Sequence, residues 1–449
     1  MTAVGSHPLL THPTPESIVA HRHGEAITVA RFVADVAYVA AMLPDGGHVL
    51  NTCGDRYRFA VGFAATLVSG RISLLPSTLT PDVADHLREF APDFFCLTDG
   101  PHVAPGVRCV QYPEAPPAAR APSPIPLIPD DRTVAWLFTS GSTGRPVPHR
   151  KSWGALVRNV RAESEILGLR DGRQHSIVAT VPAQHMYGFE STVMVALQGG
   201  AAFSAGRPLF PADICSAIAA VPRPRILVTT PFHLRTLLDA GVAIPELDLI
   251  LSATAPLSPK LVREAEARCG APLLEIYGST ESGQIASRRP ADSPEWRLFP
   301  DLTLTDDGSR VWASGGHVEH PVAMDDSLEI TAPGRFLLHG RSADMVNIAG
   351  KRSSLAYLNH QLCAVPGVVD GAFCISDDET PDGVTRLAAI VVAPELDSAT
   401  LVRALRERIE PAFLPRRLLF VDALPRNTTG KLPLAALRAL LAEQPARKR

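Results

Sequence analysis

A loop rich in glycine and hydroxyl residues is the first place in this sequence where the residue types suggest chemistry. The apolar segment 136–138 runs directly into residues 139–146, which read Thr-Ser-Gly-Ser-Thr-Gly-Arg-Pro. Glycines let backbone amides turn toward an anion, and hydroxyl groups add further donors. The pattern favours a triphosphate-binding loop, although no Gly-Lys-Ser/Thr follows and it is therefore not a Walker A loop. The alternative is an ordinary Ser/Gly-rich surface loop. The candidate phosphate ligands are Thr139, Ser140, Gly141, Ser142, Thr143 and Gly144.

A second segment combines an aromatic ring, a glycine, hydroxyl groups and a carboxylate. Residues 277–281 read Tyr-Gly-Ser-Thr-Glu and follow a short apolar stretch. The ring of Tyr277 can stack on a base, Thr280 can bond a phosphate, and Glu281 offers the oxygen ligands that Mg²⁺ prefers. The alternative is the start of a helix, with Glu281 near its N-terminus.

Strands and helices alternate on both sides of the first loop. This alternation predicts parallel sheets with helices on both faces. Residues 111–130 are rich in proline and alanine and predict a loop or linker. We expect helices at 30–42, 57–67 and 81–90, and strands at 48–51, 72–76, 94–98, 176–181, 201–203, 226–230 and 249–252.

The pattern changes after about residue 295. Short strands separated by turns predict a small antiparallel β subdomain, with strands at 302–309, 310–313, 327–330 and 335–338. A last unit begins near residue 341 and mixes helices at 354–365 and 398–409 with strands at 371–375, 387–392 and 416–421. The predicted fold class is α/β, with a large N-terminal domain over residues 1–340 and a small α+β domain over residues 341–449.

Composition narrows the function. The chain has 449 residues, of which 46% are hydrophobic, and a formal net charge of -3, so it lacks the basic footprint of a nucleic-acid-binding protein. The 7 cysteines are scattered without a CxxC pair, which indicates neither a zinc site nor a disulfide framework. We find no secretion signal and no membrane span, and we expect a cytoplasmic protein.

Four motifs in their order resemble the adenylate-forming superfamily, which includes acyl-CoA synthetases, adenylation domains of peptide synthetases and luciferases. Residues 139–144 are similar to its phosphate loop, and residues 277–281 to its Tyr-Gly-x-Thr-Glu motif. Residues 340–344 resemble the start of its C-terminal domain, and residues 425–431 resemble its Pro-Arg-x-x-x-Gly-Lys loop. The resemblance extends from about residue 15 to about 440. It implies an AMP-forming acid–thiol ligase that uses ATP and Mg²⁺ and has a mobile C-terminal domain.

The resemblance also implies roles for individual residues. Lys431 would meet the substrate carboxylate and the α-phosphate, where an ammonium and Mg²⁺ stabilise the charge of the transition state. Asp326 would bind the ribose hydroxyls together with Arg341; the spacing from Asp326 to Gly334 and Arg341 favours it over Asp325.

The resemblance also implies the remaining roles, partly through residues 182–188 around His185 and residues 252–257, which are similar to the family's Gly-Gly-Ala-Pro-Leu stretch. The catalytic set would be Lys431, His185 and Glu281, with Glu281 and Thr143 as metal ligands. Besides the phosphate loop, Asp326 and Arg341, the nucleotide site includes Ala253, Tyr277, Gly278, Ser279 and Thr280. Gly350 would border the tunnel for the thiol. The acid pocket would be lined by Phe189, Phe232, Ala255 and Ile276.

The sequence departs from the family pattern at several places, among them the phosphate loop, the hinge and residues 353–355, which read Ser-Ser-Leu in place of the usual Ile-x-Pro-x-Glu. The phosphate loop normally continues Pro-Lys-Gly-Val, whereas residues 146–149 here are Pro-Val-Pro-His, so that the loop lysine is missing. Arg150 or Lys151 can supply charge nearby. The hinge residue, usually Asp or Lys, is Ala343, which still permits rotation because the dihedral change requires no particular side chain.

Several alternatives stay open for the substrate and the acceptor. The short length and the N-terminal sequence resemble stand-alone ligases of aryl-polyene and xanthomonadin-type pigment pathways, which favours an aryl acid over a fatty or hydroxy-fatty acid. The acceptor would be the phosphopantetheine thiol of an acyl carrier protein or of CoA, with a slight preference for the carrier protein. A function of another class would be a non-catalytic relative that binds a nucleotide or an acyl group.

Overall fold

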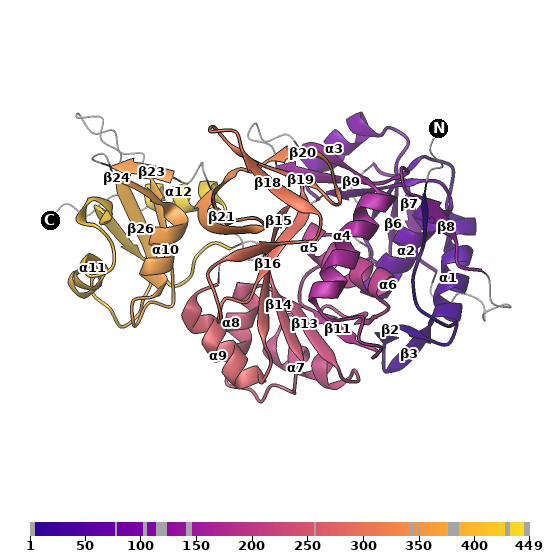
Figure 1. Ribbon diagram of the computed structural model, residues 1–449, viewed down its shortest axis with the longest axis horizontal. Coiled ribbons are helices and arrows are strands. Elements are labelled where there is room, and N and C mark those ends of the chain that lie inside the picture. Colours follow the sequence, from indigo (N-terminus) through magenta and orange to yellow (C-terminus); the bar gives the residue numbers. More distant parts are fainter. Residues whose placement is uncertain are drawn as a thin grey trace.

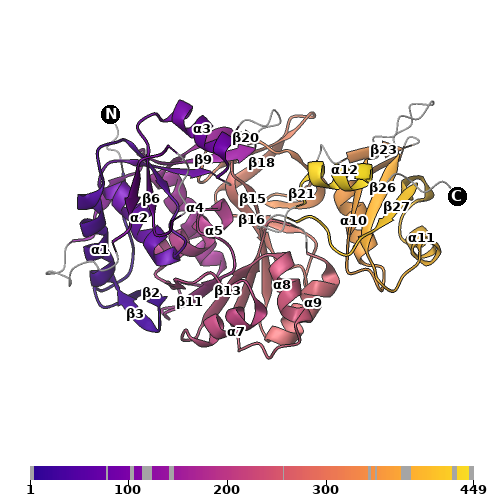
Figure 2. The same ribbon diagram turned by 180° about the vertical axis from the view of Figure 1, so that it is seen from behind.

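Figure 1 shows the computed structural model of the chain, and Figure 2 shows it from behind. A large body formed by the N-terminal and central parts of the chain lies beside a smaller C-terminal body. The structure describes residues 5–76, 79–101, 106–113, 124–140, 146–255, 257–341, 345–348, 351–375, 386–426 and 432–443.

The first sheet of the large body positions the predicted phosphate loop. Its order is β10-β9-β5-β4-β6-β7, and all neighbours are parallel except β10, which is antiparallel to β9. The bounds are β4 His48–Asn51, β5 Ile72–Pro76, β6 Phe95–Thr98, β7 Cys109–Gln111, β9 Thr133–Ser140 and β10 Pro146–Ser152. Helices α1 (Val29–Met42) and α2 (Arg56–Val68) pack on one face, and α3 (Pro81–Phe90) packs on the other.

The second sheet carries the other predicted nucleotide residues. Its order is β21-β22-β17-β16-β15-β14-β13-β11-β12-β2-β3, with a parallel centre and antiparallel pairs at both ends. The bounds are β2 Ile18–Arg22, β3 Glu25–Thr28, β11 Ser176–Ala179, β12 Ala202–Ser204, β13 Arg225–Thr229, β14 Leu249–Ser252, β15 Leu273–Ser279, β16 Gly283–Arg288, β17 Trp296–Leu298, β21 Asp326–Ala332 and β22 Arg335–Arg341.

Helices cover both faces of the second sheet. Apolar side chains of α7 (Pro211–Ala219), α8 (Pro231–Asp239) and α9 (Pro259–Cys269) form one core with β11, β13, β14 and β15. The opposite face packs against α4 (Trp153–Ile166), the π-helix Phe189–Met194 that follows α5 (Met186–Gly188), and α6 (Val195–Gly199). The ring of Phe189 contacts Phe59 and Phe63 of α2, so that one core joins the two sheets.

Smaller elements complete the structure. An antiparallel sheet of β18 (Leu302–Asp306), β19 (Val311–Gly315) and β20 (Val318–Ala323) forms part of the large body, and β1 (Ser6–Pro8) pairs with β8 (Leu127–Pro129). The C-terminal body has its own core. Its elements are β23 Met345–Ile348, β24 Lys351–Ser354, α10 Leu355–Cys363, β25 Asp370–Ile375, β26 Leu387–Val392, α11 Ser398–Arg406, a 3₁₀ turn Pro411–Phe413, β27 Arg417–Phe420 and α12 Leu434–Glu443.

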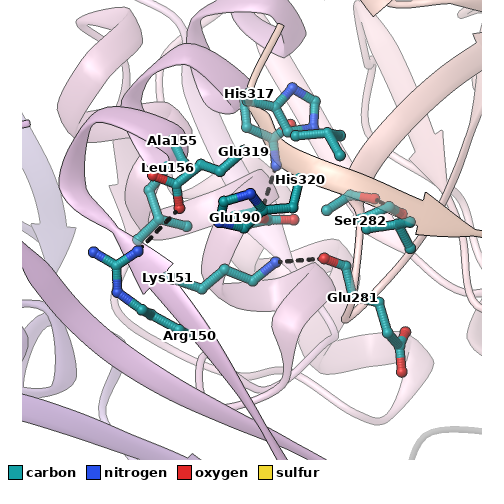
Figure 3. A pocket seen from close by; sticks show the side chains of 14 residues that line it. Arg150, Lys151, Ala155, Leu156, Glu190, Glu281, Ser282, His317, Glu319 and His320 are labelled. Atoms are coloured by element: carbon teal, nitrogen blue, oxygen red, sulfur yellow. Dashed lines mark hydrogen bonds and ion pairs between the residues drawn. The ribbon is translucent and has the colours of Figure 1, made fainter. Parts of the chain in front are cut away.

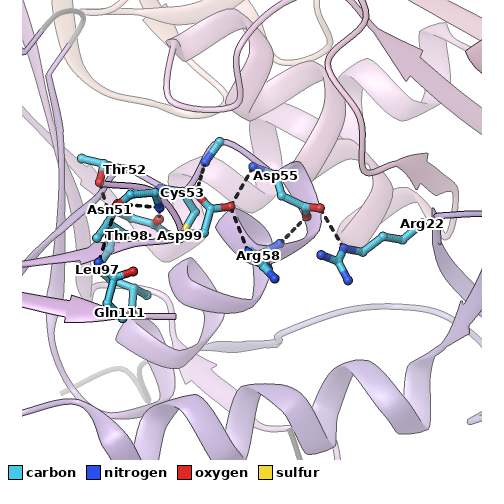
Figure 4. Close-up of polar contacts among 12 residues, drawn as sticks. Arg22, Asn51, Thr52, Cys53, Asp55, Arg58, Leu97, Thr98, Asp99 and Gln111 are labelled. Carbon is cyan, nitrogen blue, oxygen red and sulfur yellow. Dashed lines mark hydrogen bonds and ion pairs between the residues drawn. The ribbon is translucent and has the colours of Figure 1, made fainter. Parts of the chain in front are cut away.

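The entry into α2 is fixed by charged side chains (Figure 4). Asp55 caps the helix by accepting a bond from the backbone N–H of Arg58, and its carboxylate also pairs with Arg22. The Asp99 carboxylate accepts bonds from the backbone N–H groups of Gly54 and Asp55. These bonds satisfy backbone donors that a helix start leaves open.

The first residue of α2, Arg56, ties the two sheets together. Its guanidinium is completely buried and donates to four carbonyl oxygens, those of Ser204, Gly206, Ala179 and Val181, at 2.7 to 3.2 Å. Burial lowers the pKa of Arg56 to about 10, which still leaves it protonated at neutral pH. The residue therefore fixes the carboxyl ends of β11 and β12 against α2.

The predicted fold class is confirmed: an α/β large body with helix-flanked sheets, a small antiparallel sheet and an α+β C-terminal body. The prediction of a plain loop over residues 111–130 was wrong at its end, because β8 forms there and pairs with β1. The hairpin β2–β3, which extends the second sheet, was not predicted. Among the described helices, none is long and apolar enough to span a membrane.

Candidate active site

The turn between β15 and β16 presents Glu281. Residues 280–282 form this turn, which is closed by reciprocal bonds from the backbone N–H of Ser279 to Ser282 Oγ and from the N–H of Ser282 to Ser279 Oγ. A Cβ at Gly278 would lie 2.2 Å from the carbonyl oxygen of Gly283, so glycine is required there by the close approach of β16. The alternative reading of this segment as a helix start was therefore wrong.

Thr139, the first predicted phosphate ligand, lies near Glu281. Its hydroxyl is 2.9 Å from Nε2 of His149 on β10, and the same nitrogen is 3.4 Å from Glu281 Oε1. Thr139 and His149 thus lie beside the turn that carries Glu281, and their role in binding phosphate stays a prediction. The backbone of Ser140 ends β9; Gly141, Ser142, Thr143 and Gly144 lie outside the described residues.

Tyr277 and Asp326 form a direct contact. The phenol donates to Asp326 Oδ2 at 2.6 Å, and the ring packs against Trp296 and Phe336. Asp326 opens β21, and its backbone is in register with that of Arg341 at the end of β22. The structure therefore brings together the two side chains predicted to hold the base and the ribose.

The residues present suit Mg²⁺ and a nucleotide. The side chain of Glu281 is 37% exposed, and His149 is its only recorded side-chain partner within the described part of the chain. It therefore offers a carboxylate oxygen of the kind that hard cations take. Asp326 offers a carboxylate of the kind that binds ribose hydroxyls, beside the aromatic ring of Tyr277.

A cavity of about 170 Å³ lies directly behind Glu281 (Figure 3). Lys151 enters it from β10, and its Nζ lies 3.4 Å from the main-chain oxygen of Glu281. Asn159 on α4 donates to Glu190 Oε1 at 2.8 Å. The cavity is lined by Arg150, Lys151, Ala155, Leu156, Asn159, Glu190, Glu281, Ser282, Gly283, His317, Val318, Glu319, His320 and Val322.

Burial perturbs the charges around this cavity. It raises the pKa of the Glu190 carboxyl to about 7, against the opposing effects of the Lys151 ammonium and the Asn159 amide. It lowers the pKa of Lys151, against the opposing effect of the carboxylates of Glu190, Glu281 and Glu319. Burial also lowers the pKa of His317 to about 4, so its imidazole is neutral at neutral pH.

The predicted acid-pocket residues lie in different surroundings. Phe189 is completely buried and packs edge-to-face on Phe59 and Phe63, which are contacts of a core residue. Phe232 is 45% exposed at the start of α8, and Ile276 is buried in β15. Ala255 is half-buried in the bend after β14. Their common role stays a prediction.

Two further predicted residues sit on turns. His185 precedes α5, where Gly188 approaches the carbonyl oxygen of Pro182 too closely for any side chain. Ala253 follows β14, and the next residue, Thr254, has a φ of 79°, an unfavourable conformation for a β-branched residue. Strain of this kind is often found at functional sites, and the position of this bend beside adenine stays a prediction.

Other predicted residues lie outside the described part of the chain: Lys431, Gly350 and the hinge residue Ala343. Conversely, the structure brings His149, Glu190 and His317 close to Glu281, and no role for any of them was predicted from the sequence. For His149 a signal existed, since it replaces a valine of the family pattern. Glu190 and His317 are far from the motifs in sequence and carried no such signal.

Comparison with known proteins decides the family. The model of the AMP-binding enzyme family matches residues 12–305, and that of the AMP-binding enzyme C-terminal domain matches residues 359–431. The chain belongs to the AMP-binding enzyme family. The predicted membership and the reaction class of an AMP-forming acid–thiol ligase are thereby confirmed, whereas the predicted domain division at residue 340 stays a prediction.

Curated relatives of this AMP-binding enzyme include several CoA ligases. The 4-coumarate–CoA ligase of Rhodobacter capsulatus is 32% identical over 298 residues, covering 65% of this chain and 73% of the relative. That of Halorhodospira halophila is 32% identical over 308 residues, covering 66% and 73%. A 3-hydroxybenzoate–CoA/4-hydroxybenzoate–CoA ligase of Thauera aromatica is 26% identical over 362 residues, covering 71% and 68%.

Solved structures share the fold of this AMP-binding enzyme. The o-succinylbenzoate CoA synthetase of Bacillus subtilis, in complex with its acyl-adenylate intermediate, has a TM-score of 0.82 at 20% identity and covers 99% of both chains. ATP-bound MatB from Rhodopseudomonas palustris has a TM-score of 0.80 at 20% identity, covering 96% of this chain and 97% of the other.

We expect Asp326→Asn to raise the KM for ATP about tenfold, because it removes a charged acceptor for the ribose hydroxyls. The effect is measured as the ATP dependence of ATP–pyrophosphate exchange. Asp325→Asn is the matched control, since Asp325 is the exposed neighbour of Asp326. An increase in KM with Asp325→Asn but not with Asp326→Asn would show that the ribose site was assigned to the wrong aspartate.

Proposed function

We propose that this AMP-binding enzyme activates an aryl carboxylic acid with Mg²⁺-ATP and transfers the acyl group to the thiol of CoA. The relatives support the aryl acid, since their names specify 4-coumarate and hydroxybenzoates. They also support CoA as acceptor. An acyl carrier protein is the alternative acceptor, and a fatty acid is the alternative substrate.

One arrangement carries the proposal. Thr139, Glu281 and the Tyr277–Asp326 pair come from three separate segments and lie around one hairpin, β15–β16. Thr139 would contact a phosphate, Glu281 the metal, Tyr277 the base and Asp326 the ribose. A nucleotide bound along this path would extend its phosphates toward the turn that carries Glu281.

The reaction proceeds in two steps. A carboxylate oxygen of the acid attacks the α-phosphorus of ATP and pyrophosphate leaves, which gives the acyl-adenylate. The sulfur of the deprotonated thiol then attacks the acyl carbon and AMP leaves. Bound Mg²⁺ would neutralise negative charge that develops on the phosphates. Because such phosphoryl chemistry depends on positioning and charge, fixed residues such as Asp326 and Glu281 carry much of the first step.

The two steps use two orientations of the domain formed by residues 341–449 relative to residues 1–340. Lys431 serves the first step, and Gly350 borders the thiol path in the second. The hinge is Ala343. An alanine hinge leaves this rotation free, since only backbone dihedrals must change.

The test is ATP–pyrophosphate exchange with a panel of acids: 4-coumarate, cinnamate, hydroxybenzoates and fatty acids of medium and long chain. We expect exchange with at least one aryl acid, followed by thioester formation with CoA. Exchange with fatty acids alone would contradict the aryl substrate, and transfer to a holo-carrier protein but not to CoA would contradict the acceptor. ATP binding without exchange for any acid would contradict the enzymatic function.

Lys431→Ala is expected to lower the exchange rate by more than about 100-fold, because it removes a charge from the transition state of adenylation. Transfer from presynthesised acyl-adenylate to the thiol should persist, since that step uses the other orientation. Lys260→Ala, at an exposed position on α9, is the control. Unchanged exchange in Lys431→Ala would refute the role assigned to this lysine.

A further inference from the structure

Strand β10 points alternate side chains toward the predicted phosphate and metal residues. Its residues 147, 149 and 151 share one face because side chains alternate along a strand. Val147 is in register with Thr139 on β9, and Lys151 with Ala135. The face becomes more buried along the strand: Val147 is 43% exposed and Lys151 is 7% exposed. The face thus runs from the phosphate loop into the cavity behind Glu281.

The middle residue of this face bridges the two halves of the predicted site. His149 Nε2 lies 2.9 Å from Thr139 Oγ1 and 3.4 Å from Glu281 Oε1. Nε2 faces both oxygens at once, and burial lowers the pKa of His149 against the opposing effect of the Glu281 carboxylate. The imidazole therefore orients the Glu281 carboxylate relative to the first residue of the phosphate loop.

The innermost residue of the face holds the main chain of Glu281. Lys151 Nζ lies 3.4 Å from the Glu281 carbonyl oxygen (Figure 3), and the charges of the Glu190, Glu281 and Glu319 carboxylates favour its protonated form. Burying an ammonium is costly unless anions and hydrogen bonds compensate it. The neighbouring cation Arg150 has other partners, since it bonds Thr133 Oγ1 at 2.7 Å and pairs with Glu319.

We propose that His149 and Lys151 are positioning residues that hold Glu281 at two points, the carboxylate and the main chain, for metal–triphosphate binding. They take over the function of the missing loop lysine, whose place in the chain is occupied by Val147. This inference rests on the proposed function only in assigning Glu281 to the metal. Replacing either residue should therefore weaken the binding of ligands that contain metal-bound phosphates and leave the binding of other ligands unchanged.

The physical reason is preorganisation. The turn at residues 280–282 is exposed on its outer side, and a free glutamate there would lose side-chain entropy on binding a cation. The contact of His149 with the carboxylate restricts that freedom before the ligand arrives, and the contact of Lys151 with the carbonyl oxygen restrains the backbone of the turn.

The test compares binding of Mg²⁺-ATP and of AMP by calorimetry, without acid or acceptor, so that no turnover is needed. We expect His149→Val and Lys151→Met each to weaken Mg²⁺-ATP binding about tenfold, the effect of losing one charge-assisted hydrogen bond. The affinity for AMP, which lacks the β- and γ-phosphates, should change less than about twofold. Equal losses for both ligands, or no loss, would overturn the proposal.

Two double variants separate positioning from folding. Lys151→Met leaves Glu190 buried without its cation, so Lys151→Met/Glu190→Gln removes both charges and should fold with the same selective loss of Mg²⁺-ATP binding. His149→Val/Val147→Lys restores a lysine on the same face, beside Thr139. This double variant should recover most of the Mg²⁺-ATP affinity that His149→Val loses. If it does not, the claim that His149 and Lys151 take over the function of the missing loop lysine is overturned.

The binding assay distinguishes this inference from the proposed function. If the chain binds Mg²⁺-ATP and the variants weaken it selectively, the inference holds even when no acid supports exchange. If exchange occurs but the variants bind both ligands like the unmodified chain, the proposed function holds and the inference fails. A chain that binds AMP but not Mg²⁺-ATP contradicts both.

Discussion

Replacing Glu281 with glutamine is expected to lower the rate of adenylate formation by about 100- to 1000-fold, the cost of removing one preorganised group that acts on transition-state charge. Glutamine has the same shape, so the turn and its Ser279–Ser282 bonds stay intact. The variant lacks only the negative charge of the Glu281 carboxylate. Pyrophosphate exchange measured across a range of Mg²⁺ concentrations checks the effect, and the half-saturating Mg²⁺ concentration should rise.

The matched control for this variant is Glu329→Gln. Glu329 is an exposed glutamate on β21 whose recorded partner is His339. Its replacement should leave exchange and its Mg²⁺ dependence unchanged, because surface pairs contribute little. If Glu281→Gln lowered exchange equally at all Mg²⁺ concentrations, Glu281 would act on another step than metal binding.

Arg56→Met should destabilise the large body by roughly 3–5 kcal/mol, because it removes the guanidinium donors from four carbonyl oxygens, of which those of Ala179 and Val181 are buried. These oxygens belong to Ala179, Val181, Ser204 and Gly206, at the carboxyl ends of β11 and β12. Methionine retains most of the side-chain volume, so the loss of stability would come from missing hydrogen bonds rather than from a cavity. We expect the apparent melting temperature to fall by on the order of 10 °C.

Arg335→Met provides the comparison. Arg335 is 46% exposed and pairs with Glu295, so its replacement should cost at most about 1 kcal/mol. Urea unfolding followed by tryptophan fluorescence measures both variants. Equal unfolding midpoints for Arg56→Met and the unmodified chain would show that solvent replaces the guanidinium, contrary to its burial.

Local sequence patterns predicted most of the large body. The helix predicted at 30–42 is α1, Val29–Met42, and the strand predicted at 48–51 is β4. Apolar periodicity is a property of adjacent residues and is therefore readable without tertiary information. The edge hairpin β2–β3 escaped prediction, because β2 reaches its place in the second sheet by pairing with the distant strand β12.

The candidate site also contains residues that the sequence predicted and residues that it did not. Thr139, Tyr277, Glu281 and Asp326 belong to short motifs, and the structure brings them together. Glu190 carried no sequence signal, because a carboxylate on a π-helix looks like any surface glutamate until its burial is known. Lys431 and Gly350 remain predictions from sequence, outside the described residues.

For this chain, the order of motifs alone identified an enzyme that activates acids with ATP, since glycine, hydroxyl and carboxylate groups at fixed spacing reflect the ligand they bind. The motifs also showed that the loop lysine is missing. Only the tertiary structure revealed that His149 and Lys151 reach Glu281 from β10. That contact joins segments distant in sequence, and burial, which decides how strongly a charge acts, arises only when those segments pack together.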